Sequence, residues 1–206
     1  MLSLNTLLNI PCRLVLASKS PRRYDLMRHV GFVFDTIVSD VDEDAVDTSM
    51  EPALYVEHLA LLKAWAAASM IDDNAIVIGS DTTVVLDDAV LNKPSDAEDA
   101  KRMLRMLSGR SHTVHTGLAL VYVSGQHTHQ RVSSRSTLVT FRQLDEAEIQ
   151  AYVESGSPLD KAGAYGIQDD FGAMFVHRVE GCYYTIVGLP LELLYTELRE
   201  LVMECT

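Results

Sequence analysis

Apolar positions in the first part of the chain follow a strand pattern and then a helix pattern. Residues 13–17 form a short apolar run that predicts a β-strand, and residues 26–30 carry apolar side chains at helical spacing. Between them, Ser20 is a suitable N-cap and Pro21 a favoured first helical residue, because proline lacks the N–H that the first turn cannot pair. The pattern therefore predicts a strand, a tight loop and a helix over residues 13–30.

The middle of the chain continues this alternation. Apolar residues at helical spacing over residues 56–64 predict a helix that follows an acidic stretch. Residues 75–79 and 83–86 are two β runs, and they flank a Ser-Asp-Thr segment centred on Asp81. We therefore expect Asp81 at the end of a buried strand.

Two later helices carry end signals of their own. Ser95 and Glu98 have the spacing of a capping box, and Gly109 follows the last apolar position of that helix. Asp145 and Glu148 mark the start of another helix by the same spacing. The first of these helices has the clearest signal in the chain.

The rest of the pattern predicts strands, one long loop and a terminal helix. These are strands over residues 112–123 and 136–141, a loop over 158–168, a hairpin of strands over 175–179 and 183–187, and a helix over 191–201. Alternating helices and strands predict an α/β fold, and the antiparallel hairpin makes its sheet mixed. With 206 residues and no repeat or linker, we expect one domain over residues 1–206.

Charge and cysteine content restrict the class of function. The formal net charge of −12, without any Lys/Arg-rich run, argues against a nucleic-acid-binding protein. Three cysteines without CxxC spacing predict neither a disulfide framework nor a zinc site, and the seven histidines lack ligand spacing, so we expect them to be structural or exposed. The apolar opening has no basic segment and no run reaches about 18 apolar residues, so we expect a soluble cytoplasmic protein, not a membrane protein.

Arg22 and Arg23 stand in the first turn of the first predicted helix, where cations are unfavourable. That end of a helix already carries partial positive charge, and each cation there is disfavoured by about 0.3–1 kcal/mol unless an anion lies nearby. A phosphate group would resolve the conflict, with Ser18, Ser20 and the unpaired backbone N–H groups completing a cradle. The alternative is a pair of solvated arginines.

Four other residues could contribute to a site for an anion or a metal. A carboxylate at a buried strand end, such as Asp81, needs a cation or hydrogen bonds, although it could also only stabilise a turn. Lys63, on an apolar helical stretch, either extends to water or reaches a fixed anion, and Lys93 precedes a helix. Glu43 could share a hard cation with Asp81. The absence of GxxxxGK[ST], GxGxxG and GxSxG excludes a P-loop and gives no support to dinucleotide binding or acyl chemistry.

Together, nine motifs make the chain resemble the Maf family of nucleotide pyrophosphatases, in family order over nearly the whole sequence. They are Ala17-Ser18-Lys19-Ser20-Pro21-Arg22-Arg23, Asp42-Glu43, Lys63-Ala64, Gly79-Ser80-Asp81-Thr82, Lys93-Pro94, Leu107-Ser108-Gly109-Arg110, His115-Thr116-Gly117, the segment Asp160-Lys161-Ala162-Gly163-Ala164-Tyr165-Gly166-Ile167-Gln168, and Val187-Gly188-Leu189-Pro190. Two motifs depart from the family pattern. Ser80 stands where alanine is usual, and Leu61-Leu62 replaces a charged pair before Lys63.

The resemblance implies a role for each candidate residue. It makes Asp81 the catalytic carboxylate and Glu43 its partner in holding Mg²⁺ or Mn²⁺, and it implies a triphosphate site lined by Ser18, Ser20, Arg22, Arg23, Lys63 and Lys93. The form of the 160–168 motif, with Arg22, Thr82 and Gln168, resembles the subgroup that acts on dTTP and UTP. The implied fold is an elongated mixed sheet with two α/β lobes, a nucleotide cleft between them and a homodimeric assembly.

The hypothesis from the sequence is therefore hydrolysis of dTTP or UTP to the monophosphate and pyrophosphate. Water attacks the α-phosphorus, and Asp81 is either the base or only a metal ligand. Gln168 suits a pyrimidine edge because its amide offers a donor and an acceptor. Two alternatives are a house-cleaning role on modified triphosphates and a non-catalytic, nucleotide-sensing regulator of cell division.

Overall fold

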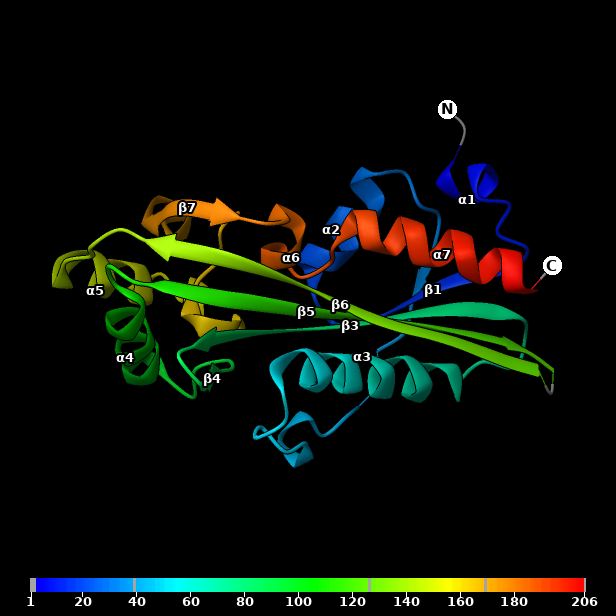
Figure 1. Ribbon diagram of the computed structural model, residues 1–206, viewed down its shortest axis with the longest axis horizontal. Helices are drawn as coiled ribbons and strands as arrows, with labels where there is room; N and C mark the ends of the chain where they lie inside the picture. The colour runs from blue at the N-terminus through cyan, green and yellow to red at the C-terminus, as the bar shows by residue number, and fades with distance from the viewer. Residues whose placement is uncertain (1–2, 39, 126, 169, 206) are drawn as a thin grey trace. The chain divides into compact units, whose positions relative to one another are not determined.

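The computed structural model describes residues 3–38, 40–125, 127–168 and 170–205, and this part of the chain contains a seven-stranded sheet (Figure 1). The strand order is β2-β1-β3-β5-β6-β7, and β4 pairs with β3. The strands are β1 (Arg13–Ala17), β2 (Asp35–Thr36), β3 (Ala75–Leu86), β4 (Ala89–Leu91), β5 (Ser111–Ser124), β6 (His127–Phe141) and β7 (Val176–Glu180).

Seven α-helices and four short 3-10 helices lie in the described residues. The α-helices are α1 (Leu4–Leu7), α2 (Pro21–His29), α3 (Pro52–Ala68), α4 (Ala97–Leu107), α5 (Glu146–Glu154), α6 (Tyr183–Val187) and α7 (Leu191–Cys205). The 3-10 helices are η1 (Glu43–Ala45), η2 (Ser157–Asp160), η3 (Ala162–Ala164) and η4 (Asp170–Phe175). Within the ranges that the structure describes, none of these helices combines the length and the apolar character needed to cross a bilayer.

The sheet is mixed, as predicted, but its antiparallel pairs are not the expected ones. Strand β1 is parallel to β2 and to β3, whereas β4 is antiparallel to β3 and β7 to β6. The predicted hairpin over 175–187 was wrong, because its second half is helix α6. A short apolar run fits a strand or a helix equally well by composition. Here a distant residue, Thr137 on β6, exchanges hydrogen bonds with the backbone N–H and carbonyl of Cys182 just before the helix.

Helix ends were predicted with mixed success. Ser20 is the N-cap of α2 with Pro21 as its first residue, and the α5 capping box of Asp145 and Glu148 is present, as predicted. The box expected at Ser95 and Glu98 was wrong by one residue: Asp96 caps α4 by accepting from the N–H of Asp99. Ser95 is instead held through its own N–H, which donates to the Asp99 carboxylate at 3.1 Å. Asp is as good an N-cap as Ser, so local preference alone did not separate the two.

The chain divides into two compact units. Unit 1 contains residues 1–81, 116–135 and 188–206, and unit 2 contains residues 82–115 and 136–187. The boundary between residues 81 and 82 falls inside strand β3, and β5 and β6 also contribute residues to both units. Whether the chain behaves as the single domain expected from its sequence stays a prediction.

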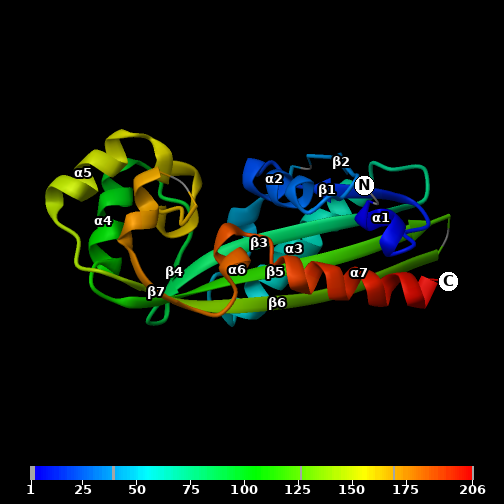
Figure 2. The same cartoon turned by 90° about the horizontal axis from the view of Figure 1, so that it is seen from above.

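Unit 1 has helices on both faces of its part of the sheet (Figures 1 and 2). Along β1, Leu14 and Leu16 point to a leucine-rich core with α2 and α7, while Val15 and Ala17 point to a second core with α3. This alternation follows from the two-residue period of a strand. The α3 core is made largely of alanines, so that helix lies very close to the sheet.

Unit 2 packs α4, α5 and η4 around an aromatic core. The rings of Phe141, Tyr152, Tyr165 and Phe175 lie in one cluster with mostly edge-to-face contacts, between 4.7 and 5.9 Å apart. Such contacts add to the stabilisation from burial alone. The cluster includes one imidazole, that of His112.

Candidate active site

The loop between β1 and α2 brings two serine hydroxyls and the N-terminus of a helix to one point of unit 1. Ser20 caps α2 only through its backbone, because its side chain makes no capping hydrogen bond. The Ser18 hydroxyl accepts from the Ser20 N–H at 3.1 Å and lies 3.4 Å from an Arg23 nitrogen. The first turn of α2 has no acidic residue. The predicted cradle of Ser18, Ser20 and Arg23 is therefore brought together, and it has the groups that bind an anion.

Arg23 is held as a partly buried cation. Its Nε donates to the carbonyl of Gly188 at 2.7 Å, and desolvation lowers the pKa of the guanidinium. Attraction to Asp81 and Glu43 opposes that shift, whereas repulsion from Arg22 adds to it. Two cations and two carboxylates are thus close enough to interact. The alternative of solvated arginines does not describe Arg23.

Asp81 lies inside one continuous strand and not in a turn. The two β runs predicted over 75–79 and 83–86 are a single strand, β3, and the pairing of β1 with β3 extends to Gly79. The expectation of a strand end was therefore wrong, and so was the turn alternative. Only 7% of the Asp81 surface is exposed. A carboxylate at this depth requires a cation or a set of donors to stay ionised.

Lys63 supplies that cation. Its Nζ lies 2.5 Å from an oxygen of Asp81 and 2.9 Å from an oxygen of Glu43, so two carboxylates converge on one ammonium group. We define Asp81, Lys63 and Glu43 as the carboxylate–lysine centre. Of the two interpretations offered for Lys63, contact with a fixed anion is therefore the correct one.

The donors of the carboxylate–lysine centre suit a hard divalent cation. Two carboxylate oxygens already share one positive group, and Mg²⁺ is bound in proteins by one or two carboxylates together with substrate phosphates and water. In the part of the chain that the structure describes, no group of three or more His, Cys, Asp or Glu residues could hold a metal by itself.

Ser80, the first departure from the family pattern, has its hydroxyl in the interior. The residue is fully buried, and its hydroxyl lies 2.8 Å from the carbonyl of Gly117 and 3.0 Å from that of Gly188. Gly188 is also the acceptor for Arg23. The hydroxyl therefore ties β3 to the segment that holds Arg23. The second departure is the pair Leu61-Leu62. Leu61 packs against the alanine-rich core between α3 and the sheet.

Three predicted residues belong to unit 2. Thr82 follows Asp81 on β3 and is half-buried, whereas Lys93 and Gln168 are exposed. The neighbourhood of Lys93 is well anchored, because Thr83 donates to the side chain of Asn92 at 2.9 Å. The roles of Thr82, Lys93 and Gln168 stay predictions.

Sequence reasoning missed a buried polar pair in unit 2. His112 is 2% exposed, and its Nε2 lies 2.8 Å from the hydroxyl of Tyr165. Desolvation lowers the pKa of His112 to about 4, so the ring is neutral near pH 7. Because the histidines lack ligand spacing, we expected them to be structural or exposed. No local signal distinguishes His112 from the others. Its partner, however, lies within the 160–168 motif.

We expect His112 to make the protein less stable in mild acid. The unfolded chain binds a proton near pH 6.5 and the folded chain only near pH 4, so protonation favours unfolding between these values. Stability is fully present above about pH 6.5 and falls by about 3 kcal/mol as the pH drops to about 4. Urea unfolding of wild type and His112→Gln across this range measures the effect. His177→Gln, at an exposed histidine of the same unit, is the control. An equal pH slope in wild type and His112→Gln would contradict the assignment.

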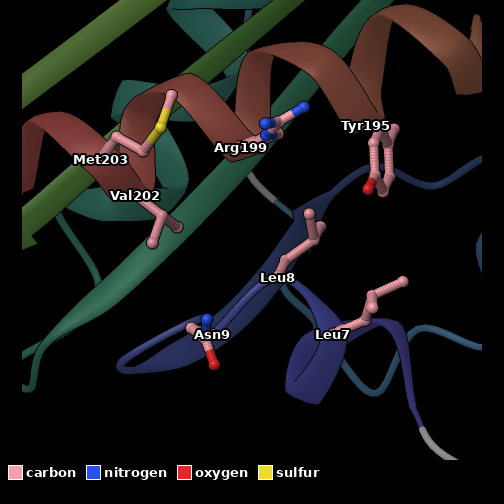
Figure 3. Close-up of a pocket in the computed structure, with 7 residues that line it drawn as sticks. All are labelled: Leu7, Leu8, Asn9, Tyr195, Arg199, Val202 and Met203. Atoms are coloured by element: carbon pink, nitrogen blue, oxygen red, sulfur yellow. The ribbon is translucent and has the colours of Figure 1, made fainter.

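A pocket elsewhere in unit 1 contains none of the predicted site residues (Figure 3). Its volume is about 420 Å³, and it lies between the α1 segment and α7. The lining residues are Leu7, Leu8, Asn9, Tyr195, Arg199, Val202 and Met203. Its lining has one cationic side chain, that of Arg199, and no carboxylate.

Known proteins match the chain over most of its length. A family model described as "Maf-like protein" matches residues 13–201. A protein of Salinibacter ruber named "dTTP/UTP pyrophosphatase" is 46% identical over 196 residues, covering 95% of this chain and 94% of that protein. Proteins with the same name from Vibrio cholerae and Symbiobacterium thermophilum are 49% and 50% identical over 179 residues, covering 87% of this chain and 92% and 89% of theirs.

Among solved structures, the Staphylococcus aureus Ham1 protein is similar over 63% of this chain and 72% of its own, with 15% identity and a TM-score of 0.40. The match to the family model extends from β1 into α7. It contains all the residues of the carboxylate–lysine centre and of the β1–α2 loop. The chain therefore belongs to the Maf family.

Proposed function

We propose that this protein hydrolyses dTTP and UTP to the monophosphate and pyrophosphate. The observation that carries the proposal is the convergence of Asp81 and Glu43 on Lys63, within the unit that also presents Arg23 at the start of α2. A carboxylate pair and fixed cations are what phosphoryl chemistry needs, since its catalysis is positioning and charge stabilisation. Relatives that share 42–50% of their residues are named for this activity.

The cations of unit 1 bind the phosphates. Arg22 and Arg23, at the N-terminus of α2, hold the β- and γ-phosphates, and Lys63 exchanges its carboxylate partners for a phosphate oxygen. The bond between the α-phosphorus and the bridging oxygen of the β-phosphate breaks, and pyrophosphate leaves. Lys93 adds a further positive charge, a role that rests on the family resemblance.

Asp81 acts on the attacking water. Its carboxylate accepts the proton of the water as the new bond to the α-phosphorus forms, and before that step the carboxylate is paired with Lys63. Glu43 and Asp81 together would hold Mg²⁺ or Mn²⁺, which when bound neutralises phosphate charge and acidifies water.

We assign recognition of the base to Gln168, Arg22 and Thr82. Gln168 donates to a carbonyl and accepts from the N–H of uracil or thymine, and Arg22 and Thr82 complete the recognition. This assignment rests on the 160–168 motif and on the names of the relatives. Modified pyrimidine triphosphates present the same edge and are expected substrates. The homodimer and the cytoplasmic location stay predictions.

Glu43→Gln should raise the metal concentration needed for half-maximal turnover by about tenfold. The amide keeps the shape of the side chain but removes one of the two negative charges that converge at the centre. Turnover of dTTP during titration with Mn²⁺ measures the change. Glu57→Gln on α3 is the control, because Glu57 is paired with Ser134 and not with Lys63. Unchanged metal dependence in Glu43→Gln would remove Glu43 from the metal site.

The proposed function is tested by pyrophosphate release from dTTP, UTP, dCTP, GTP and 7-methyl-GTP, with Mg²⁺ or Mn²⁺. We expect release from dTTP and UTP, and its loss on chelation of the metal. A preference for 7-methyl-GTP would overturn the pyrimidine assignment. Nucleotide binding without release from any triphosphate would favour the nucleotide-sensing regulator instead.

A further inference from the structure

The buried pair of His112 and Tyr165 in unit 2 has no part in the chemistry proposed above. Both residues lie in the aromatic core, 2% and 5% exposed, with their polar atoms 2.8 Å apart. Each ring also packs edge-to-face on Phe141, at 4.9 and 4.7 Å. In this largely apolar cluster, two apolar side chains in place of His112 and Tyr165 would avoid the cost of burying an imidazole and a hydroxyl. The pair therefore calls for a role other than stability, such as a fixed orientation.

Tyr165 belongs to a segment, residues 161–168, whose backbone is held at several points. The N–H of Gly163 donates to the carbonyl of Asn92 at 3.2 Å, and the N–H of Gly166 donates to the hydroxyl of Tyr152 at 3.2 Å. A side chain at position 163 would lie 2.9 Å from Val84, so the segment also packs closely on β3. These contacts hold the segment on both sides of Tyr165.

The conformation of this segment is one that it would not adopt by itself. Gly163 and Ala164 have φ angles of 66° and 59°, in the left-handed region. That region suits glycine, but it is unfavourable for alanine, so surrounding contacts must maintain it. Ala164 directly precedes Tyr165, whose side chain is the one fixed by His112. The hydrogen bond is therefore well placed to stabilise the unfavourable backbone.

We propose that His112 is a positioning residue for base selectivity, because through Tyr165 it fixes the 161–168 segment that ends at Gln168. The inference rests on the proposed function, in which Gln168 reads the pyrimidine edge. Gln168 is exposed and lies three residues beyond Tyr165, so a looser segment lets its amide rotate away from the base. The phosphates and the attacking water are handled by residues outside the 161–168 segment. Loss of the pair should therefore alter recognition of the base more than the rate of the chemical step.

The test compares Tyr165→Phe with a matched deletion of a buried hydroxyl. Tyr165→Phe removes only the oxygen that contacts His112, and His112→Leu breaks the same contact from the other side. The control is Thr137→Val, which removes a 1% exposed hydroxyl of unit 2 that is bonded to Cys182 and not to the segment. For each variant, kcat and KM are measured with dTTP and dCTP, since cytosine has an amino donor where thymine has a carbonyl acceptor.

We expect Tyr165→Phe to raise KM for dTTP about fivefold and to lower the preference for dTTP over dCTP about fivefold. This factor corresponds to the net contribution of one neutral hydrogen bond. Its kcat should stay within about twofold, and Thr137→Val should keep the wild-type preference. If Tyr165→Phe does not fold, the same loss of preference in His112→Leu supports the proposal. Wild-type preference in the folded variants, or an equal loss in Thr137→Val, overturns it while the proposed function stands. A wild-type protein that hydrolyses no triphosphate overturns both.

Discussion

Asp81→Asn should lower kcat for dTTP by about a thousandfold. The amide has the size of the carboxylate but can neither accept the proton of the attacking water nor carry the negative charge that holds Lys63. General base catalysis contributes about 10²–10⁴ to the rate, and the loss of a metal ligand acts in the same direction. Pyrophosphate release at saturating Mn²⁺ and dTTP measures the effect without a contribution from weaker binding.

The control for this substitution is Asp73→Asn. Asp73 forms an exposed ion pair with Arg13, 3.5 Å apart, in the same unit, and its amide variant should keep full activity. In Asp81→Asn, Lys63 keeps Glu43 as a partner, so we expect the variant to fold. Circular dichroism and thermal unfolding check this. A well-folded Asp81→Asn with more than a tenth of the wild-type kcat would exclude Asp81 as the base.

Elements with strong local signals were predicted well from the sequence. Strand β1 has the predicted bounds, α2 begins at Pro21, and the capping box of Asp145 and Glu148 starts α5. The terminal helix α7 covers the predicted 191–201 range. In each case the residues that determine the element lie within it or next to it.

The errors occur where a distant partner decides the local structure. Strand β3 continues through Ser80 and Asp81, where the Ser80 hydroxyl contacts the carbonyls of Gly117 and Gly188, residues far away in the sequence. Residues 183–187 form a helix although their composition suits a strand. Neither outcome follows from propensity, which tertiary contacts override.

The candidate site was only partly predictable. A lysine on an apolar helix and an aspartate in a buried strand were each noted, but their contact at 2.5 Å depends on how α3 packs on the sheet. From the sequence, only the family resemblance assigned Lys63 and Asp81 to the same site. The contact between His112 and Tyr165 had no comparable signal, because Tyr165 falls in the predicted 158–168 loop and no spacing distinguishes His112 from the other histidines.

The packing of α3 leads to a second large effect, expected for Gly79→Ala. A Cβ at Gly79 would lie 2.1 Å from the carbonyl oxygen of Ala60 and 2.9 Å from the backbone nitrogen of Ala64. These are backbone atoms of α3, so the helix itself must move away from β3. We expect a loss of about 3 kcal/mol in the free energy of unfolding, measured with urea. The φ angle of Gly79 is not in the left-handed region, so the cost of the substitution is steric.

The same movement should also lower activity, because Lys63 precedes Ala64 on α3 and Asp81 lies two residues after Gly79 on β3. A displacement of about 1 Å can cost about a hundredfold in rate, so kcat/KM for dTTP should fall by roughly that factor in the folded fraction. Gly156→Ala is the control: its φ of 76° costs about 1–2 kcal/mol, but a Cβ there meets open space. Equal losses of activity in the two variants would mean that general destabilisation, and not the distance from α3 to β3, sets the geometry of the carboxylate–lysine centre.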